Sequence, residues 1–330
     1  MDTNAFKVCV RCMTYNQSAY IKDALNGFCM QKTNFPFVCV IVDDASTDGE
    51  QEVISNYLNS NFDLEDNSVV KNEETDDYVL TFAKHKSNKN CFFAVLLLKY
   101  NHYHKKDKFP YISKWCEMSK YIAQCEGDDY WIHDRKLQMQ VDFLDSHNEY
   151  GLIYTDYFER IDKTLRNGTF IPVYKLEDYL LKKGFIPTAT TLFRTNLFMQ
   201  RDLEYTKMGF LMGDVPLWIQ LMYASKMERL QEKTAVYRIL PESASHSHEY
   251  EKTQLFSINA WEVRKYFADK YGLDEISKQI EKEVIKDKAL LALYQGNYWY
   301  YFKAKPWKYG IFNIKLLIGI VLKRMKNIVN

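Results

Sequence analysis

Apolar and polar residues alternate along the first half of the chain in blocks typical of alternating strands and helices. Patterns typical of helices occur at 18–31, 46–58 and 134–147. Uninterrupted apolar runs of strand length occur at 6–14, 35–44, 91–100 and 120–125. Such runs are typical of strands buried on both faces. The pattern predicts an α/β fold with a mostly parallel sheet flanked by helices.

The second half of the chain changes from mixed to helical sequence. The mixed part has strand patterns and helix patterns in turn, at 151–158, 176–183, 188–194, 214–225 and 234–240. From about residue 250 onward the pattern is helical throughout. We therefore expect a large domain over 1–245 and a helical extension over 246–330.

Polar or acidic residues follow three of the predicted strands at the point where each strand ends. They are Thr14–Asn16, Asp43–Asp44 and Glu126–Asp129. Because binding sites of parallel sheets lie beyond the carboxyl ends of the strands, these groups are expected to meet at one edge. Three carboxylates within four positions repel one another unless a cation or water shares the space.

Composition narrows the class of protein. The 330 residues are 47% hydrophobic, and 44 Lys and Arg balance 43 Asp and Glu. This balance argues against a dedicated nucleic-acid binder, which carries a basic patch. The seven cysteines all precede residue 126: Cys9, Cys12, Cys29, Cys39, Cys91, Cys116 and Cys125. The odd count and the polar opening of the chain predict reduced thiols in a cytoplasmic protein.

Three segments in order resemble family 2 glycosyltransferases of the GT-A fold. They read MTYNQSAYIKDALNGFCMQ, VIVDDASTDGE and CEGDDYWIHDRKLQMQ. The resemblance covers roughly 6–160 and continues more loosely to about 245. It implies transfer of a sugar from a nucleotide-diphosphate sugar to an acceptor hydroxyl, with a divalent metal and inversion of the anomeric centre. It also implies a GT-A fold.

The acidic turn is the expected metal site. Hard carboxylate oxygens suit Mn²⁺ or Mg²⁺, which would neutralise the charge of a diphosphate leaving group. We favour Asp128 and Asp129 as ligands, with Glu126 on the nucleotide-sugar side, where the family usually has an aspartate. A solvated acidic loop before the helix at 134 is the alternative.

The first two strand ends resemble the nucleoside-binding walls of the family. Asp43 and Asp44 would accept hydrogen bonds from the base or ribose. The opposite wall would be lined by Thr14, Tyr15 and Asn16. The alternatives are a capping role for the aspartates beside Ser46, the predicted N-cap, and a simple turn for the other three.

The resemblance also implies a general base ahead of a helix. LMGDVPLWIQL places Asp214 before an apolar helical face, although the family usually has Glu-Asp where this chain has Gly213 and Asp214. A helix N-terminus is expected to lower the pKa of Asp214 and keep it ionised. Capping of that helix is the alternative role. Trp131 and Trp218 are expected on the acceptor side.

A later segment, YRILPESASHSH, resembles the part of the family that closes over the diphosphate. Arg238 is expected to contact the nucleotide-sugar, and His246 or His248 to join the metal. We favour His246. His102 and His104 lie in a basic stretch that is predicted to be a solvated loop without a role.

The end of the chain is basic and apolar. Residues 302–330 hold seven basic residues and no acidic one, and the apolar stretch 311–322 is interrupted by Lys315. Twelve residues cannot span a bilayer, which takes about 20. A helix lying on an anionic surface, at the inner face of the cell membrane, is predicted. A terminal helix docked on the protein is the alternative.

Two other functions compete with glycosyl transfer. A sugar-phosphate nucleotidyltransferase would show a glycine-rich phosphate loop after the first strand, and CMTYNQSAY contains no glycine. A non-catalytic carbohydrate-binding relative would have a broken acidic cluster. The Q-x-x-R-W signature of processive members is missing as well. We therefore expect single-residue transfer to a glycan or lipid-linked acceptor, in cell-surface polysaccharide synthesis.

Overall fold

The computed structural model describes residues 5–103, 107–169, 171–240 and 249–305. It divides into two compact units. The first unit consists of Met1–Tyr174, Ile186–Arg201 and Leu221–Arg238. The second unit consists of Lys175–Phe185, Asp202–Gln220 and Ile239–Asn330. The division thus differs from the expected boundary after residue 245, because two segments of the predicted first domain belong to the second unit.

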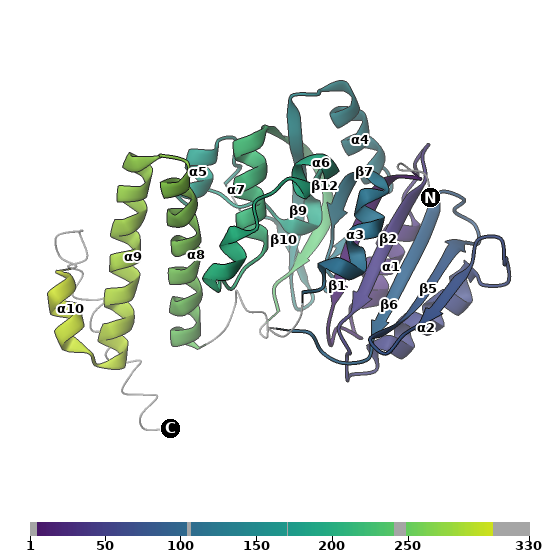
Figure 1. Ribbon diagram of the computed structural model, residues 1–330, viewed down its shortest axis with the longest axis horizontal. Coiled ribbons are helices and arrows are strands. Elements are labelled where there is room, and N and C mark those ends of the chain that lie inside the picture. The colour runs from purple at the N-terminus through teal and green to yellow at the C-terminus, as the bar shows by residue number, and fades with distance from the viewer. Residues whose placement is uncertain (1–4, 104–106, 170, 241–248, 306–330) are drawn as a thin grey trace. The chain divides into compact units, whose positions relative to one another are not determined.

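The strands described in the structure form one twelve-stranded sheet in the first unit. They are β1 (Phe6–Thr14), β2 (Phe37–Asp43), β3 (Phe62–Asp63), β4 (Lys71–Glu74), β5 (Tyr78–His85), β6 (Cys91–Leu98), β7 (Ser119–Gln124), β8 (Tyr130–Trp131), β9 (Tyr150–Ile161), β10 (Thr164–Asn167), β11 (Leu192–Arg194) and β12 (Lys226–Arg238). The central order β6-β2-β1-β7 is parallel (Figure 1). Antiparallel β5 extends one side, and β11 is antiparallel to both β7 and β9 on the other.

The central strands are buried on both faces, as their apolar runs predicted. Every residue of β2 is buried, and the strand is paired on both edges. The register aligns Thr14 with Asp43, so the carboxyl ends of β1 and β2 lie level. This alignment places the polar residues that follow the two strands beside each other.

Helices cover both faces of this sheet in the first unit. Their bounds are α1 (Ile21–Cys29), α2 (Glu50–Asn61), α3 (Phe109–Glu117), α4 (Lys136–Ser146) and α6 (Thr195–Met199). One core cluster joins α1, α2 and α4 to the sheet face that carries Val10 and Cys12. On the other face, Cys9 lies 3.8 Å from Cys116 of α3. Cys9 and Cys12 therefore point to opposite faces, and all seven cysteines are free thiols.

Three features of the first unit differ from the sequence prediction. The β4–β5 hairpin and α3 were not predicted, because the hairpin begins in the polar stretch KNEETDD and α3 follows the basic loop. Helix α2 begins at Glu50 with Gly49 as N-cap, φ 87°, rather than at Ser46. Glycine adopts this left-handed conformation without steric cost.

The second unit is helical, as predicted for the sequence after residue 250. It contains α5 (Leu176–Leu180), α8 (Tyr250–Lys270), α9 (Asp274–Gln295) and α10 (Tyr298–Ala304). The first residues of α7 (Asp214–Ala224) also belong to it. Helices α8 and α9 lie side by side, joined by a short turn in which Gly272 has φ 68° (Figure 1). Short 3₁₀ segments occur at Thr188–Thr190 in the first unit and Glu204–Met208 in the second.

None of the helices resolved over residues 5–305 combines the length and the hydropathy needed to cross a bilayer. The surface helix that the sequence predicts at the end of the chain falls on 306–330, outside the described residues, and stays a prediction.

Candidate active site

The ends of three neighbouring parallel strands form the candidate site. β2, β1 and β7 are adjacent in the sheet, and each is followed by a polar turn. The turn after β7 is tied to β1 by two backbone bonds, Cys125 N–H to the Arg11 carbonyl at 3.1 Å and Gly127 N–H to the Met13 carbonyl at 3.2 Å. The predicted convergence of the strand ends is therefore present in the structure.

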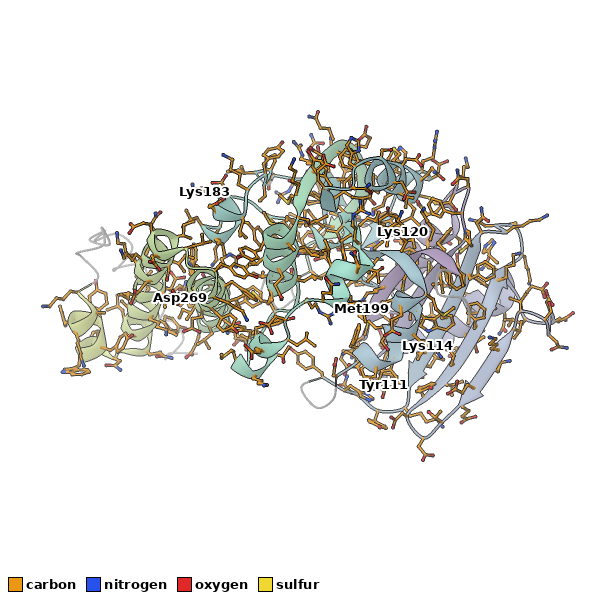
Figure 2. The ribbon with its side chains drawn as sticks, turned by 45° about the horizontal axis from the view of Figure 1, so that its top comes forward. Tyr111, Lys114, Lys120, Lys183, Met199 and Asp269 are labelled. Atoms are coloured by element: carbon orange, nitrogen blue, oxygen red, sulfur yellow. The ribbon has the colours of Figure 1, made fainter. Side chains whose placement is uncertain are left out.

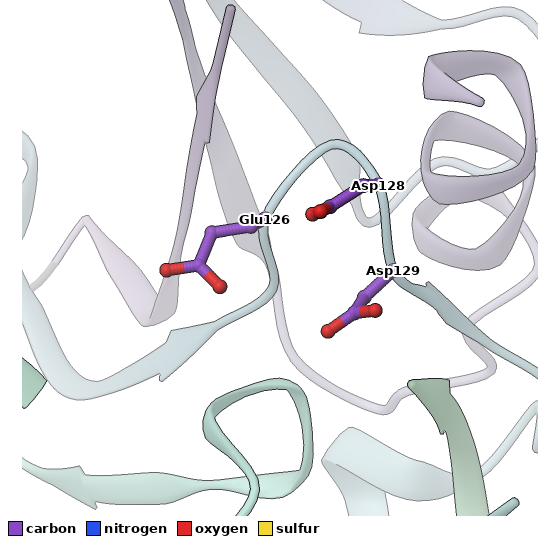
Figure 3. Close-up of side chains that lie close together, drawn as sticks. All are labelled: Glu126, Asp128 and Asp129. Carbon is purple, nitrogen blue, oxygen red and sulfur yellow. The ribbon is translucent and has the colours of Figure 1, made fainter. Parts of the chain in front are cut away.

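The acidic turn holds the carboxylates of Glu126, Asp128 and Asp129 close together. One oxygen from each lies within 4.8 Å of the others, and Figure 3 shows all three side chains on one short turn. Glu126 is exposed, Asp128 is half-buried and Asp129 is buried. An all-oxygen set of this kind suits Mg²⁺ or Mn²⁺.

Asp129 is the most constrained member of the acidic turn. Its Oδ1 accepts a hydrogen bond from the backbone N–H of Arg238 at 2.8 Å. The Asp129 side chain is almost entirely buried. Burial raises the pKa of Asp129 well above its usual range, the Asp128 charge raises it further, and the Arg238 N–H opposes the rise. A divalent cation would relieve this repulsion, so the residues present fit the expected metal.

Arg238 contacts the acidic turn directly. Its guanidinium donates to the backbone carbonyl of Asp128 and to the carboxylate of Asp23. It also stacks on Tyr130, with 4.4 Å between the guanidinium carbon and the ring centre. Arg238 therefore holds the acidic turn in place and compensates its charge, and its predicted contact with the nucleotide-sugar stays a prediction.

Asp43 keeps an acceptor available at the end of β2. The residue is fully buried, and Oδ1 accepts the Ser46 N–H at 3.0 Å and the Gln51 side-chain amide at 2.6 Å. Its Oδ2 has no hydrogen-bond partner among the described residues. A buried acceptor of this kind is costly unless a ligand supplies a donor, which is consistent with the predicted nucleoside contact.

Asp44 is committed to the loop that follows β6. Its Oδ1 accepts the His102 N–H at 2.8 Å, and its Oδ2 accepts Lys108 Nζ at 2.7 Å. These contacts, an ion pair among them, join Asp44 to the loop, and its predicted contact with the nucleoside stays a prediction. The partners come from 58 and 64 residues further along the chain, beyond the reach of local sequence patterns.

His102 is not the solvated residue that the sequence suggested. It is 1% exposed, and its Nε2 lies 3.0 Å from the hydroxyl of Tyr111 on α3. Figure 2 labels Tyr111 among the side chains of this unit. Its Nδ1 lies 2.7 Å from the Tyr100 carbonyl. The imidazole therefore links the loop to α3. His104, His246 and His248 fall outside the described residues.

Glu50 is a residue of this site that the motifs of the sequence did not mark as functional. It is fully buried, and Oε1 accepts the Thr14 hydroxyl. Its Oε2 accepts the Gln17 N–H at 2.8 Å and the Ser46 hydroxyl at 2.9 Å. Burial raises the pKa of Glu50, and these hydrogen bonds oppose the rise. The carboxylate thereby fastens the turn after β1 to the turn after β2.

The turn after β1 exposes one aromatic ring. Tyr15 is 46% exposed, and Asn16 adopts φ 54°. The side-chain oxygen of Asn16 accepts a hydrogen bond from the backbone N–H of Thr47 at 2.8 Å. The backbone N–H of Asn16 donates to the Ser46 hydroxyl at 2.9 Å. The two turns are therefore braced twice, and the Tyr15 ring is left available for stacking.

Gly127 allows the acidic turn to approach β1. A Cβ at this position would lie 2.3 Å from Thr14 Oγ1 and 2.6 Å from Gln17 Oε1. No side chain fits in that space, so the spacing of the acidic turn depends on glycine here. The sequence alone does not reveal this constraint, because it arises between segments more than 100 residues apart.

The two tryptophans expected near an acceptor are core residues instead. Trp131 is 2% exposed, its indole N–H donates to the Ala189 carbonyl at 2.8 Å, and its ring packs edge-on against Phe28. Trp218 is fully buried as well. A buried ring offers no surface to an acceptor, so neither residue has the predicted placement.

Asp214 belongs to the second unit and begins α7. Its Oδ1 accepts the Val215 N–H at 2.8 Å, which is a capping contact. Burial raises the pKa of Asp214, while the Val215 N–H and the nearby Arg264 charge oppose the rise. The expected lowering by the helix terminus is therefore outweighed by loss of solvent.

A separate hollow lies at the amino ends of β2 and β6. It has a volume of about 830 Å³, and its lining includes Lys32, Lys89 and Arg135. Most of its lining residues precede β2 or β6 and the others lie at α4, whereas the acidic turn follows the carboxyl end of β7. We therefore do not assign it to the strand-end site.

Comparison with known proteins gives a family match for the first part of the chain and a similarity of fold. Residues 9–82 match the model described as Glycosyl transferase family 2. The uncharacterized protein Rv1520 of Mycobacterium tuberculosis is 26% identical over 261 residues, covering 76% of this chain and 63% of that protein. The uncharacterized protein Mb1547 of Mycobacterium bovis matches to the same extent. The chain therefore spans less than two thirds of these relatives.

The fold is similar to that of TarS from S. aureus, with a TM-score of 0.52 and 17% sequence identity. The match covers 85% of this chain and 43% of TarS. The α/β architecture is thus that of the GT-A glycosyltransferases. The segment matched over residues 9–82 contains the first two of the three motifs and is similar to family 2 glycosyltransferases, in agreement with the resemblance that those motifs carry.

Proposed function

We propose that the protein transfers one sugar from a nucleotide-diphosphate sugar to an acceptor hydroxyl, with inversion and with help from a divalent metal. The observation that carries the proposal is the acidic turn of Glu126, Asp128 and Asp129 at the carboxyl end of β7. Strand β7 lies beside β1 in the sheet, and the turn after β1 is hydrogen-bonded to the turn after β2.

Asp128 and Asp129 would hold the metal, and Glu126 lies close enough to contribute. The bound ion would neutralise charge that develops on the departing diphosphate. The chain itself supplies the shape of this site, since Arg238 fixes the Asp128 carbonyl and Gly127 permits the close approach to Thr14.

The nucleoside would bind between the turns after β1 and β2. The exposed Tyr15 ring offers a stacking surface, and Asp43 Oδ2 offers an acceptor for a base N–H or a ribose hydroxyl. Glu50 keeps the two turns at a fixed spacing. The turn after β1 would thus contact the ring of the nucleoside, and the end of β2 would accept its hydrogen bonds.

Asp214 would act as the general base. It would take the proton of the acceptor hydroxyl while that oxygen bonds to the anomeric carbon and the bond to the diphosphate breaks. A raised pKa supports this role, because a base is most effective when its pKa approaches the working pH. The acceptor class, a glycan or lipid-linked saccharide of the cell surface, rests on the family resemblance alone.

Donor binding with and without metal tests the proposal. Calorimetry with UDP-, GDP- and dTDP-sugars should show binding that requires Mn²⁺ and is lost in EDTA. Asp128→Asn should weaken Mn²⁺-dependent binding by about 100-fold or more, since it removes a ligand and not only a supporting contact. Asp76→Asn, at an exposed position before β5, is the matched control. Donor affinity that EDTA leaves unchanged would contradict the metal assignment.

A further inference from the structure

The hollow at the amino ends of β2 and β6 is built from three separate segments. They are the end of α1 with the turn after it (29–34), the turn between β5 and β6 (87–89) and the start of α4 (135–142). All three belong to the first unit. The volume of about 830 Å³ is that of a small-molecule site rather than of a single ion or water molecule.

Amide side chains fasten these segments to one another. Gln31 is fully buried, and its side chain donates to the His133 carbonyl at 2.9 Å and accepts a hydrogen bond from the backbone N–H of Leu137 at 3.1 Å. The Asn88 side-chain amide donates to the carbonyls of Cys29 and Gln31, at 2.9 and 2.8 Å. Hydrogen bonds between its walls therefore fix the shape of the hollow before any ligand binds.

Three cations line the hollow, and two of them have no anionic partner. Lys32 Nζ lies 2.7 Å from a carboxylate oxygen of Asp134. In contrast, the exposed side chains of Lys89 and Arg135 make no hydrogen bond or ion pair with any residue that the structure describes. The Arg135 charge contributes less than Lys32 to the lowered pKa of Asp134. Two unpaired like charges thus reach the same hollow from different segments.

The remaining lining is polar and carries little negative charge. Among the described residues Asp142 is the only acidic member of the lining, and its Oδ1 accepts the Gln138 side-chain amide at 2.7 Å. Gln138 Oε1 in turn accepts the backbone N–H of Asn34 at 2.9 Å. Apart from Cys29 and Met30, the other lining residues carry amides or hydroxyls. Such a lining is complementary to a ligand that is both anionic and rich in hydroxyl groups.

We propose that this hollow binds a phosphate ester of a sugar or polyol, at a second ligand site apart from the strand-end site. The phosphate pairs with the Lys89 ammonium and the Arg135 guanidinium together, because a dianion can engage two cations at once. The amides and hydroxyls of the walls bind the hydroxyl groups of the ligand. The observations that carry the proposal are the two unpaired cations and the hydrogen-bonded walls around them.

This site is independent of the proposed glycosyl transfer. The hollow lies at the amino ends of β2 and β6, whereas the acidic turn follows the carboxyl end of β7, which runs parallel to them through β1. The two sites are therefore at opposite edges of the central sheet. Loss of one ligand should leave binding of the other unchanged.

Calorimetry of the full chain with glucose 6-phosphate, glucuronate and glucose tests the proposal. The titrations contain EDTA, so that a metal-dependent donor site does not contribute. Glucose 6-phosphate should bind, glucuronate should bind more weakly because it carries a single charge, and glucose should not bind. Lys89→Ala/Arg135→Ala should weaken binding of glucose 6-phosphate by about 30-fold or more, since two charge-assisted contacts are lost.

The matched control removes the same charge outside the hollow. Lys71→Ala/Lys163→Ala changes two exposed lysines of the same unit and should leave the affinity for glucose 6-phosphate nearly unchanged. Equal weakening by the two double variants would overturn the proposal, because the effect would then come from overall charge. Failure of the wild type to bind glucose 6-phosphate would overturn it as well. Glucuronate that binds as tightly as glucose 6-phosphate would overturn the assignment to a phosphate ester.

The methyl resonances of the methionines show where the ligand binds. Met30 lines the hollow, whereas Met13 lies near the carboxyl end of β1, beside the strand-end site. Titration with glucose 6-phosphate should shift the Met30 signal, assigned with Met30→Leu, and leave the Met13 signal in place. A shift of Met13 without a shift of Met30 would place the ligand at the strand-end site and overturn the proposal.

Discussion

The acidic turn after β7 and the start of α7 each hold an aspartate whose pKa is raised by burial, but their surroundings differ. Around Asp129 the next contributions come from the like charge of Asp128 and from the opposing Arg238 N–H. Around Asp214 every further contribution favours the ionised form, led by the Val215 N–H and the Arg264 charge. The first arrangement calls for an added cation, whereas the second leaves a single carboxylate whose proton affinity is adjustable.

The two regions are also packed differently. A Cβ on Gly127 in the acidic turn would overlap Thr14, whereas a Cβ on Gly213 beside Asp214 would meet nothing within 4 Å. One region therefore depends on a fixed approach of two segments, and the other does not. This contrast supports a rigid donor and metal site and a base whose position is set by its own helix.

The largest expected effect concerns the base. Asp214→Asn keeps the size of the side chain and its capping oxygen but cannot accept a proton. The turnover number should fall by about 10²–10⁴-fold, with donor affinity little changed. The measurement is kcat at saturating donor and acceptor, alongside calorimetry of the donor. Loss of donor binding with turnover retained at saturation would place Asp214 in the donor pocket.

The pH profile gives an independent control for Asp214. Because its pKa is raised and the ionised form is the active one, kcat should fall on the acid side as pH drops through that raised pKa. The residual activity of Asp214→Asn should lack this acid limb. An unchanged limb in the variant would assign the titration to another group.

Much of the strand-end site could be predicted because short, continuous stretches of sequence determine it. Apolar runs that end abruptly in Asp43 or before Glu126 identify both the strands and their carboxyl ends. Parallel pairing then brings these ends together without further information. The structure confirms this step, with Thr14 in register with Asp43.

The features that the sequence did not reveal have a different physical origin, in contacts between distant segments. Asp44 looks like its neighbour in sequence, but Lys108 neutralises it from a loop 64 residues away. Trp131 is of a residue type that often stacks on ligands, but in this protein its ring packs against Phe28. Burial of an aromatic ring is decided by the elements packed around it, which a periodic pattern in one segment does not contain.

A smaller effect than loss of catalysis is expected from the glycine contrast. Gly127→Ala should lower the free energy of unfolding by about 1–3 kcal/mol, the usual cost of forcing an extra carbon into a packed site. Gly213→Ala should have little effect, because its space is open and its φ is not in the left-handed region. Urea unfolding of the two variants measures both. Equal losses would mean that the approach of the acidic turn to Thr14 is not tight.

The smallest expected effect separates the two kinds of aspartate by stability in the metal-free protein. The raised pKa of Asp129 means that the folded state binds its proton more tightly than the unfolded chain does. Stability is therefore present at low pH and is lost as pH rises through the raised pKa. Asp129→Asn keeps an acceptor for the Arg238 N–H and carries no charge. Above that pKa the variant should be more stable than the wild type, by about 1 kcal/mol.

Asp145 provides the control of opposite sign. Burial would raise its pKa, but hydrogen bonds from Lys120 and Lys7 outweigh burial and lower the pKa to about 2. Asp145→Asn should therefore lose stability at neutral pH and approach the wild type in acid. Saturating Mn²⁺ should stabilise the wild type more than Asp129→Asn, because only the wild type offers that carboxylate to the ion. If Asp129→Asn instead follows the pattern of Asp145→Asn, the buried carboxylate is stabilised by its neighbours and needs no cation.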